Sequence, residues 1–199
     1  KADCGGCEGC SRCCHGMGKS IILDPYDVYR MTTGMGKSMQ ELLAASVEFN
    51  VVDGVILPNL KMQGTEEACA YLDEEGRCSI HPYRPGICRL FPLGRYYENG
   101  GFSYFLQTGE CAKENRSKIK VSKWIDTPDL TRNQQFTLQW HDLLHAMEER
   151  LTGEDEGKQK EENLLLLRLF YLLPYEGTID FYTQFTERME HWNGQNGQI

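Results

Sequence analysis

The most informative stretch of this sequence is CEGCSRCC, which spans residues 7–14. Each two-residue spacer returns a sulfur to the same side of a tight loop, and Gly9 permits the sharp turn that such a loop requires. Thiolates gathered in this way are ligands for zinc or for an iron–sulfur centre. A disulfide within so short a loop would constrain little of the unfolded chain. The spacing therefore predicts metal ligation in preference to disulfide formation.

All nine cysteines lie within the first 111 of the 199 residues. They are Cys4, Cys7, Cys10, Cys13, Cys14, Cys69, Cys78, Cys88 and Cys111. Their number is odd, and their share of the chain is below the roughly 8–10% that is typical of small disulfide-bonded proteins. The last four stand singly, so the chain has no second C-x2-C pair of the kind that zinc knuckles use. This pattern favours an iron–sulfur centre, [4Fe-4S] in type, and leaves zinc open as the alternative.

Two alternatives are less favoured: a ferredoxin-type cysteine run, and histidines that replace some of the cysteine ligands. Cys4, Cys7, Cys10 and Cys14 also fit the C-x2-C-x2-C-x3-C run of bacterial ferredoxins, but His15 replaces the usual proline and no second run follows. We therefore do not expect a ferredoxin fold. The neighbouring histidines are candidate substitute ligands, although eight thiols make them unnecessary. These histidines are His15 and His81.

The residues around the later cysteines carry a family resemblance. Residues 76–81 read GRCSIH and residues 84–92 read RPGICRLFP. Together with the CxxCxxCC run, they resemble the YkgJ-type cysteine-cluster family, whose domain is described as chelating zinc or iron through eight characteristic cysteines. The resemblance covers about residues 4–115, and flagellin lysine methylases look similar in carrying a related cluster that is associated with iron–sulfur binding. The ligands that it implies are Cys7, Cys10, Cys13, Cys14, Cys69, Cys78, Cys88 and Cys111.

Two arginines flank one of the later cysteines. Arg84 and Arg89 lie on either side of Cys88, where guanidinium groups would offset the negative charge of a thiolate-ligated centre and donate hydrogen bonds around it. We predict that both contact the bound group. The alternative is that each packs over a nearby aromatic ring with its charged end in water.

Local patterns predict a small α+β fold: an irregular cysteine-rich region with short hairpins and helices, then a helical region. Asp24 and Ser38 have the positions of helix caps. Beyond Asp126 the apolar residues recur with the period of a helix. The expected helices are 25–31, 39–49, one opening at Thr127-Pro128, 160–172 and 175–191, and the expected hairpins are 51–57, 70–80 and 94–106.

Charge and cysteine content divide the chain at the same place. Residues 1–119 hold 13 basic and 15 acidic side chains, a net charge of −2, whereas residues 120–199 hold 8 and 14, a net charge of −6. We therefore predict a cysteine-cluster metal-binding domain over 1–119 and an acidic helical extension, packed on it, over 120–199. The extension is a possible surface for a protein partner.

Several classes of function are not supported. The overall net charge of −8 argues against nucleic acid as the main partner. No apolar run is long enough to span a bilayer, and cysteines stand where a signal peptide would be apolar, so we expect a cytoplasmic protein with no membrane partner. The two GMGKS repeats, at 16–20 and 34–38, lack the first glycine of a phosphate-binding loop. In the pair His141 and His145, Asp142 replaces the glutamate of a zinc-protease motif, so we expect no hydrolytic site there.

Three functional classes stay open at the level of the sequence. The first is an accessory protein that uses a metal centre for electron transfer, delivery or sensing. The second is an iron–sulfur-dependent enzyme that modifies a protein or a small molecule, although no cosubstrate loop is recognisable. The third is a structural zinc module that serves protein interaction. The sequence does not decide whether the protein is an enzyme.

Overall fold

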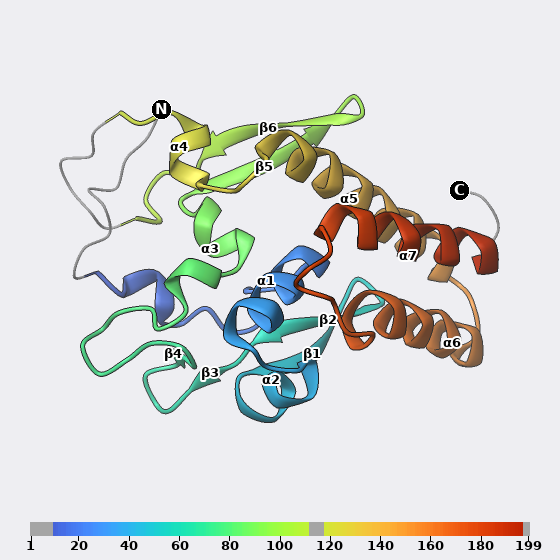
Figure 1. Cartoon of the computed structure of the whole chain (residues 1–199), viewed down its shortest axis with the longest axis horizontal. Coiled ribbons are helices and arrows are strands. Elements are labelled where there is room, and N and C mark those ends of the chain that lie inside the picture. Colours follow the sequence, from blue (N-terminus) through green and yellow to red (C-terminus); the bar gives the residue numbers. More distant parts are fainter. Residues whose placement is uncertain (1–9, 112–117, 197–199) are drawn as a thin grey trace.

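The fold combines short helices, small antiparallel hairpins and a set of longer helices near the C-terminus (Figure 1). It is seen in a computed structural model that describes residues 10–111 and 118–196. The cysteine-bearing segments lie at one end of the molecule, around β3, β4 and α3, and the C-terminal helices lie at the other. The predicted α+β class, with a helical region following a cysteine-rich one, is confirmed.

The first helix, α1 (Pro25–Met35), begins where the sequence predicts and ends later. The Asp24 carboxylate accepts from the Asp27 amide, and the Asp27 carboxylate accepts from the Asp24 amide, which completes a capping box. The predicted end at residue 31 is wrong. The hydroxyls of Thr32 and Thr33 donate to helix carbonyls one turn back, and the helix continues to Gly36, whose φ of 64° ends it.

The second helix is shorter than predicted because a strand begins within its expected range. Helix α2 (Met39–Ala45) is capped by Ser38 as expected. Residues 47–49, however, belong to β1 (Val47–Val52), which pairs with β2 (Val55–Leu60). Val47 faces Leu60 across this hairpin, and both side chains are buried, so packing overrides the helical pattern. The predicted hairpin turn at Asp53-Gly54 is confirmed, and both residues have positive φ.

The hairpin predicted over 70–80 is reduced to a single antiparallel bridge. Leu72 pairs with Cys78, the Ser79 amide donates to the Tyr71 carbonyl, and the Asp73 carboxylate accepts from the Arg77 amide in the turn that connects the two sides. The strand pair nearby is β3 (Met62–Gln63) with β4 (Ala68–Cys69). The third predicted hairpin is confirmed as β5 (Leu93–Glu98) with β6 (Gly101–Leu106).

Four short helical segments were not predicted from the sequence. They are the single turns η2 (Arg12–Cys14) and η3 (His81–Tyr83) and the helices α3 (Gly86–Leu90) and α4 (Val121–Ile125). Each is too short for a helical pattern to be visible. Helix α4 packs on α3, and the indole of Trp124 donates to the carbonyls of Leu90 and Phe91.

The C-terminal region contains the three long helices that the sequence pattern indicates, with different boundaries. They are α5 (Leu130–Leu151), α6 (Glu156–Leu167), which continues as the π-helical turn η4 (Arg168–Leu172), and α7 (Phe181–Asn196). The predicted start of the last helix at residue 175 is wrong. Tyr175 is buried and donates to the Phe170 carbonyl, and Asp180 accepts from the Thr183 amide in the first turn of α7.

The two halves of the chain share one apolar core. Leu23 and Met31 from the first half and Phe170 and Trp192 from the second belong to the same cluster of buried side chains. The Tyr171 hydroxyl also donates to the Leu23 carbonyl at 3.1 Å. The C-terminal helices are therefore packed directly on the elements of the first half. None of the helices within 10–111 and 118–196 is both long and apolar enough to cross a membrane.

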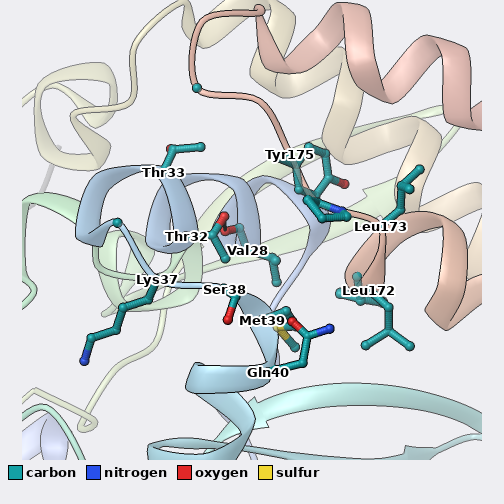
Figure 2. Close-up of a pocket in the computed structure, with 14 residues that line it drawn as sticks. Val28, Thr32, Thr33, Lys37, Ser38, Met39, Gln40, Leu172, Leu173 and Tyr175 are labelled. Atoms are coloured by element: carbon teal, nitrogen blue, oxygen red, sulfur yellow. Dashed lines mark hydrogen bonds between the residues drawn. The ribbon is translucent and has the colours of Figure 1, made fainter.

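A cavity of about 260 Å³ lies at this seam, between the α1–α2 connection and the segment that follows η4 (Figure 2). Leu172 and Leu173 form one wall, whereas Lys37 extends away from them. The hydroxyls of Thr32 and Tyr175 already donate to backbone carbonyls. The cavity wall is therefore mostly apolar, and these two hydroxyls are committed to the fold.

Candidate metal centre

Five of the eight predicted ligands line a single cavity of about 270 Å³. These five are Cys13, Cys14, Cys69, Cys78 and Cys88. They come from four segments that are far apart in the sequence: η2, β4, the turn before η3, and α3. The fold therefore brings together at one place sulfurs that the sequence spreads over 76 positions, from 13 to 88.

Backbone pairing places the first two segments beside each other. His15, directly after the paired cysteines of η2, forms a bridge with Ala68, the residue before Cys69. The Gly16 amide donates to the Glu67 carbonyl at 3.0 Å and extends this contact. Because these bonds join backbone to backbone, they fix the cysteine run against β4 whatever the side chains do.

A buried carboxylate positions the helix that carries Cys88. The Asp27 side chain, 3% exposed, accepts from the Gly86 amide at 2.6 Å, and Gly86 is the first residue of α3. This bond joins residues 59 positions apart. Burial, together with the adjacent Asp24 carboxylate, raises the pKa of Asp27 well above its usual value. No local sequence signal points to this role, because Asp27 also fits the capping box of α1.

The adjacent thiols of Cys13 and Cys14 are hydrogen-bonded to each other, and their pKa values shift in opposite directions. The Cys14 thiol donates to the Cys13 sulfur, and this bond lowers the pKa of Cys13 to about 6. The same bond, followed by burial, raises the pKa of Cys14. At neutral pH one sulfur of the pair is therefore a thiolate, which is the form that binds metal.

The remaining thiols combine burial with hydrogen bonds to sulfur. Burial raises the pKa of Cys69, Cys78 and Cys88. The Tyr71 amide donates to the Cys69 sulfur and the Ile80 amide to the Cys78 sulfur, and both bonds oppose this rise. Each donor lies two residues after its cysteine, so the same local turn recurs. Amide bonds of this kind stabilise the negative charge of a metal-bound thiolate.

The two predicted arginines have different places. Arg84 lines the cavity, and its Nη1 lies 2.8 Å from Nε2 of His81. Burial, then Arg84, lowers the pKa of His81, which keeps its ring neutral so that Nε2 can accept. Arg89 is 5% exposed and donates to the carbonyls of Arg84, Pro82 and Asp126. It therefore ties the loop around Cys88 to the end of α4.

Other residues that the sequence singles out lie elsewhere. Cys10 and Cys111 are half-buried, whereas Cys4 and Cys7 lie outside the described residues. His15 places Nδ1 3.4 Å from the Glu66 carbonyl. His141 stacks on Tyr97 with ring centroids 3.7 Å apart, and His145 lies near Glu149. Within 10–111 and 118–196, no three His, Cys, Asp or Glu side chains stand close enough together to hold a metal ion.

The thiols that the structure describes are chemically available. Cys10, Cys13, Cys14, Cys69, Cys78 and Cys88 are free of disulfides. Soft sulfur donors select zinc, copper(I) and iron–sulfur centres. The chemistry of the donors lining the cavity therefore fits a thiolate-ligated centre, although no three of the described thiols stand within ligating distance of one ion.

Comparison with known families agrees with this chemistry. A family model named CxxCxxCC, with the description "Putative zinc- or iron-chelating domain", matches residues 6–122. The chain belongs to this family. The match covers more than half of the sequence and every cysteine from Cys7 to Cys111. No curated protein and no solved structure matches the chain. Metal binding by the CxxCxxCC region is thus supported by the family and by its donors, and the family description leaves zinc and iron both open.

The hydrogen-bonded pair Cys13 and Cys14 leads to a test in solution. In the metal-free protein, alkylation of Cys13 by iodoacetamide should rise with pH around a midpoint of about 6, because its thiolate forms there. Cys88, whose pKa is raised by burial, should become reactive only at a much higher pH. Replacing Cys14 by alanine removes the donor and should move the Cys13 midpoint towards about 8.5. Mass spectrometry of the alkylated peptides measures each site, and equal midpoints for the two proteins would contradict the pairing.

Proposed function

We propose that this protein holds an iron–sulfur centre of the [4Fe-4S] type and serves an accessory, electron-transfer or modifying role. The observation that supports it best is the convergence of five thiols on one cavity of about 270 Å³. The last four cysteines stand singly and form no second C-x2-C pair, which favours a cluster over zinc knuckles.

The proposed ligands are drawn from the cysteines of the family region. They are Cys7, Cys10, Cys13, Cys14, Cys69, Cys78, Cys88 and Cys111. A cubane cluster needs four thiolates. The five that line the cavity are sufficient for one, and Cys7, Cys10 and Cys111 are the remaining proposed ligands.

The protein's own groups would hold and tune the centre. When bound, an iron–sulfur cluster supplies one-electron chemistry. The amides of Tyr71 and Ile80 donate to two of the sulfurs, and Arg84 brings positive charge to the cavity wall. We propose Arg84 as a direct contact of the bound group. Arg89 would act one step further out, by holding the Arg84 carbonyl and the loop around it.

Zinc is the alternative, because the family description includes it and because thiolates are also common zinc ligands. In that case the cysteine region would be a structural module for protein interaction, with residues 120–199 as an extension packed on 1–119 and available to a partner. A third possibility is an iron–sulfur enzyme of protein or small-molecule modification. Thiols that stay reduced are typical of the cytosol, where we place the protein in either case.

Anaerobic purification of the full chain separates the two metals. A brown protein with an absorbance band near 400 nm, and with about four irons and four sulfides per chain, is the expected result. A colourless protein with stoichiometric zinc and no sulfide would overturn the iron–sulfur proposal in favour of the structural module. Iron chelation should bleach the band and lower the melting temperature, since ligands from distant segments make binding part of folding.

A further inference from the structure

The β1–β2 hairpin, seen beside α2 in Figure 1, has two edges, and the rest of the chain covers the edge of β2. There the Ile56 amide donates to Oδ1 of Asn163 at 2.6 Å. Two residues further along the same edge, the Pro58 carbonyl accepts from the Leu23 amide at 2.8 Å. Strand β2 is therefore paired on both sides, whereas β1 is paired with β2 on one side.

The other edge of β1 presents backbone groups that bond to nothing in β2. In an antiparallel pair, two facing residues either bond to each other or both direct N–H and C=O away from the pair. Ile56 and Pro58 direct theirs away, because they bond to other elements. They face Val51 and Phe49, whose backbone groups therefore point to the outer edge of β1. Among the described residues, no other backbone segment bonds to these groups.

The side chains on this edge are apolar and exposed. Phe49 is 37% exposed and Val51 is 63% exposed, and because they are two residues apart they share one face of the strand. Edge strands of soluble proteins are usually protected on such a face by a lysine, another charge or a proline. Here the one charged residue of β1, Glu48, is on the opposite face, as is Asn50. The exposed face of β1 has none of these protections.

The strand is complementary to a second copy of itself. Two antiparallel copies related by a twofold axis at Asn50 would place Phe49 of each copy opposite Val51 of the other. These are the residues whose backbone groups point outward, so the same register satisfies both the backbone and the side chains. An aromatic ring opposite a β-branched side chain is a favourable cross-strand pair. Glu48 would lie opposite Val52 of the second copy, so like charges do not meet.

The neighbouring registers fit less well. A twofold axis at Val51 would place Phe49 opposite Asp53, an apolar ring against a carboxylate. An axis at Phe49 would place Val51 opposite Val47, whose side chain is buried in its own chain and offers no exposed surface. The axis at Asn50 matches exposed apolar surface with exposed apolar surface. Such a match of a strand with itself is what a symmetric interface requires, and it favours a second copy over an unrelated partner.

We propose that this protein forms a weak symmetric dimer in which the β1 strands of two copies pair edge to edge. The two hairpins would then form one continuous sheet that spans both copies. Because Asn163 and Leu23 cover the outer edge of β2 in each copy, the sheet ends there and the assembly is closed. No residue of β1 lines the cysteine cavity, so the dimer is independent of the metal proposal.

Sedimentation equilibrium of the full chain tests the dimer, with a reductant present so that no disulfide joins two chains. We expect a dissociation constant on the order of 100 µM, because so short a strand pair buries less than the roughly 1,200 Å² of a stable complex. Val51→Lys should weaken association at least tenfold, since it places a charge opposite Phe49 of the second copy. Tyr96→Lys, at a residue of β5 that is 59% exposed, introduces the same side chain into another strand and should change nothing. A protein that stays monomeric up to about 1 mM, or a dimer that Val51→Lys does not weaken, would overturn the proposal.

Amide hydrogen exchange in the unaltered protein locates the contact without a substitution. Exchange at Phe49 and Val51 should slow as the protein concentration rises, because their amides become bonded to the second copy. The amides of Glu48 and Asn50 already point to β2 and should change much less. Exchange at Phe49 and Val51 that does not depend on concentration would overturn the proposal even if a dimer forms. Metal content should be equal for Val51→Lys and the unaltered protein, which separates this result from the fate of the proposed centre.

Discussion

Replacing Cys88 by serine is expected to remove most of the bound metal and to lower the melting temperature of the loaded protein. Cys88 lies on α3, and it reaches the cavity from a different segment than the paired cysteines of η2. A hydroxyl is a poor substitute for a thiolate with a soft metal. Loss of a direct ligand should exceed the roughly 10- to 100-fold loss of metal affinity that is typical of an outer-shell partner.

The matched control changes the same cavity without touching a thiol. Met17 also lines it, and Met17→Leu preserves both apolar character and approximate volume. Metal analysis and thermal melting of both variants, before and after chelation, separate ligation from packing. The two should melt similarly once the metal is removed. If Cys88→Ser keeps full metal content and the normal melting temperature, Cys88 is not a ligand.

The sequence reveals the candidate centre well because cysteine chemistry is visible without a structure. Spacing alone identifies the dense run, and the residues flanking Cys78 and Cys88 indicate the family. Short-range signals also predict the caps at Asp24 and Ser38 and two of the three hairpins, since each depends on contacts between neighbours in the chain. Five of the predicted ligands then line one cavity, which no local signal could show.

What the sequence misses depends on contacts between distant residues. The bond from the Gly86 amide to Asp27 spans 59 positions, and nothing around either residue indicates it. Residues 47–49 have a helical apolar pattern but form a strand, because Val47 pairs with Leu60 in the hairpin. The role of Arg89 also depends on contacts that the sequence does not show. Its position beside Cys88 suggests contact with the bound group, whereas the structure directs its donors to three carbonyls.

The shared apolar core leads to a second prediction with a large expected effect, this time on the free energy of unfolding. It compares alanine substitutions at two leucines of α6. Leu166 is fully buried in the main cluster, whereas Leu164, two residues earlier, is 55% exposed. Leu166→Ala should lower the free energy of unfolding by about 2–5 kcal/mol, since it removes buried methyl groups and leaves a cavity. Leu164→Ala should change it by no more than about 0.5 kcal/mol. Because the substitution is the same on the same helix, helix propensity cancels from the comparison.

The same pair of variants tests how residues 120–199 relate to the metal-binding half. Leu166 has no part in the cysteine cavity, yet its cluster includes Leu23 and Met31 of the first half. Release of the metal and loss of helical circular dichroism should therefore coincide in one denaturation transition, and Leu166→Ala should shift both signals by the same amount. If helical signal is lost first while the metal stays bound, the C-terminal helices unfold separately, and the packed extension is not required for the metal-binding half to stay folded.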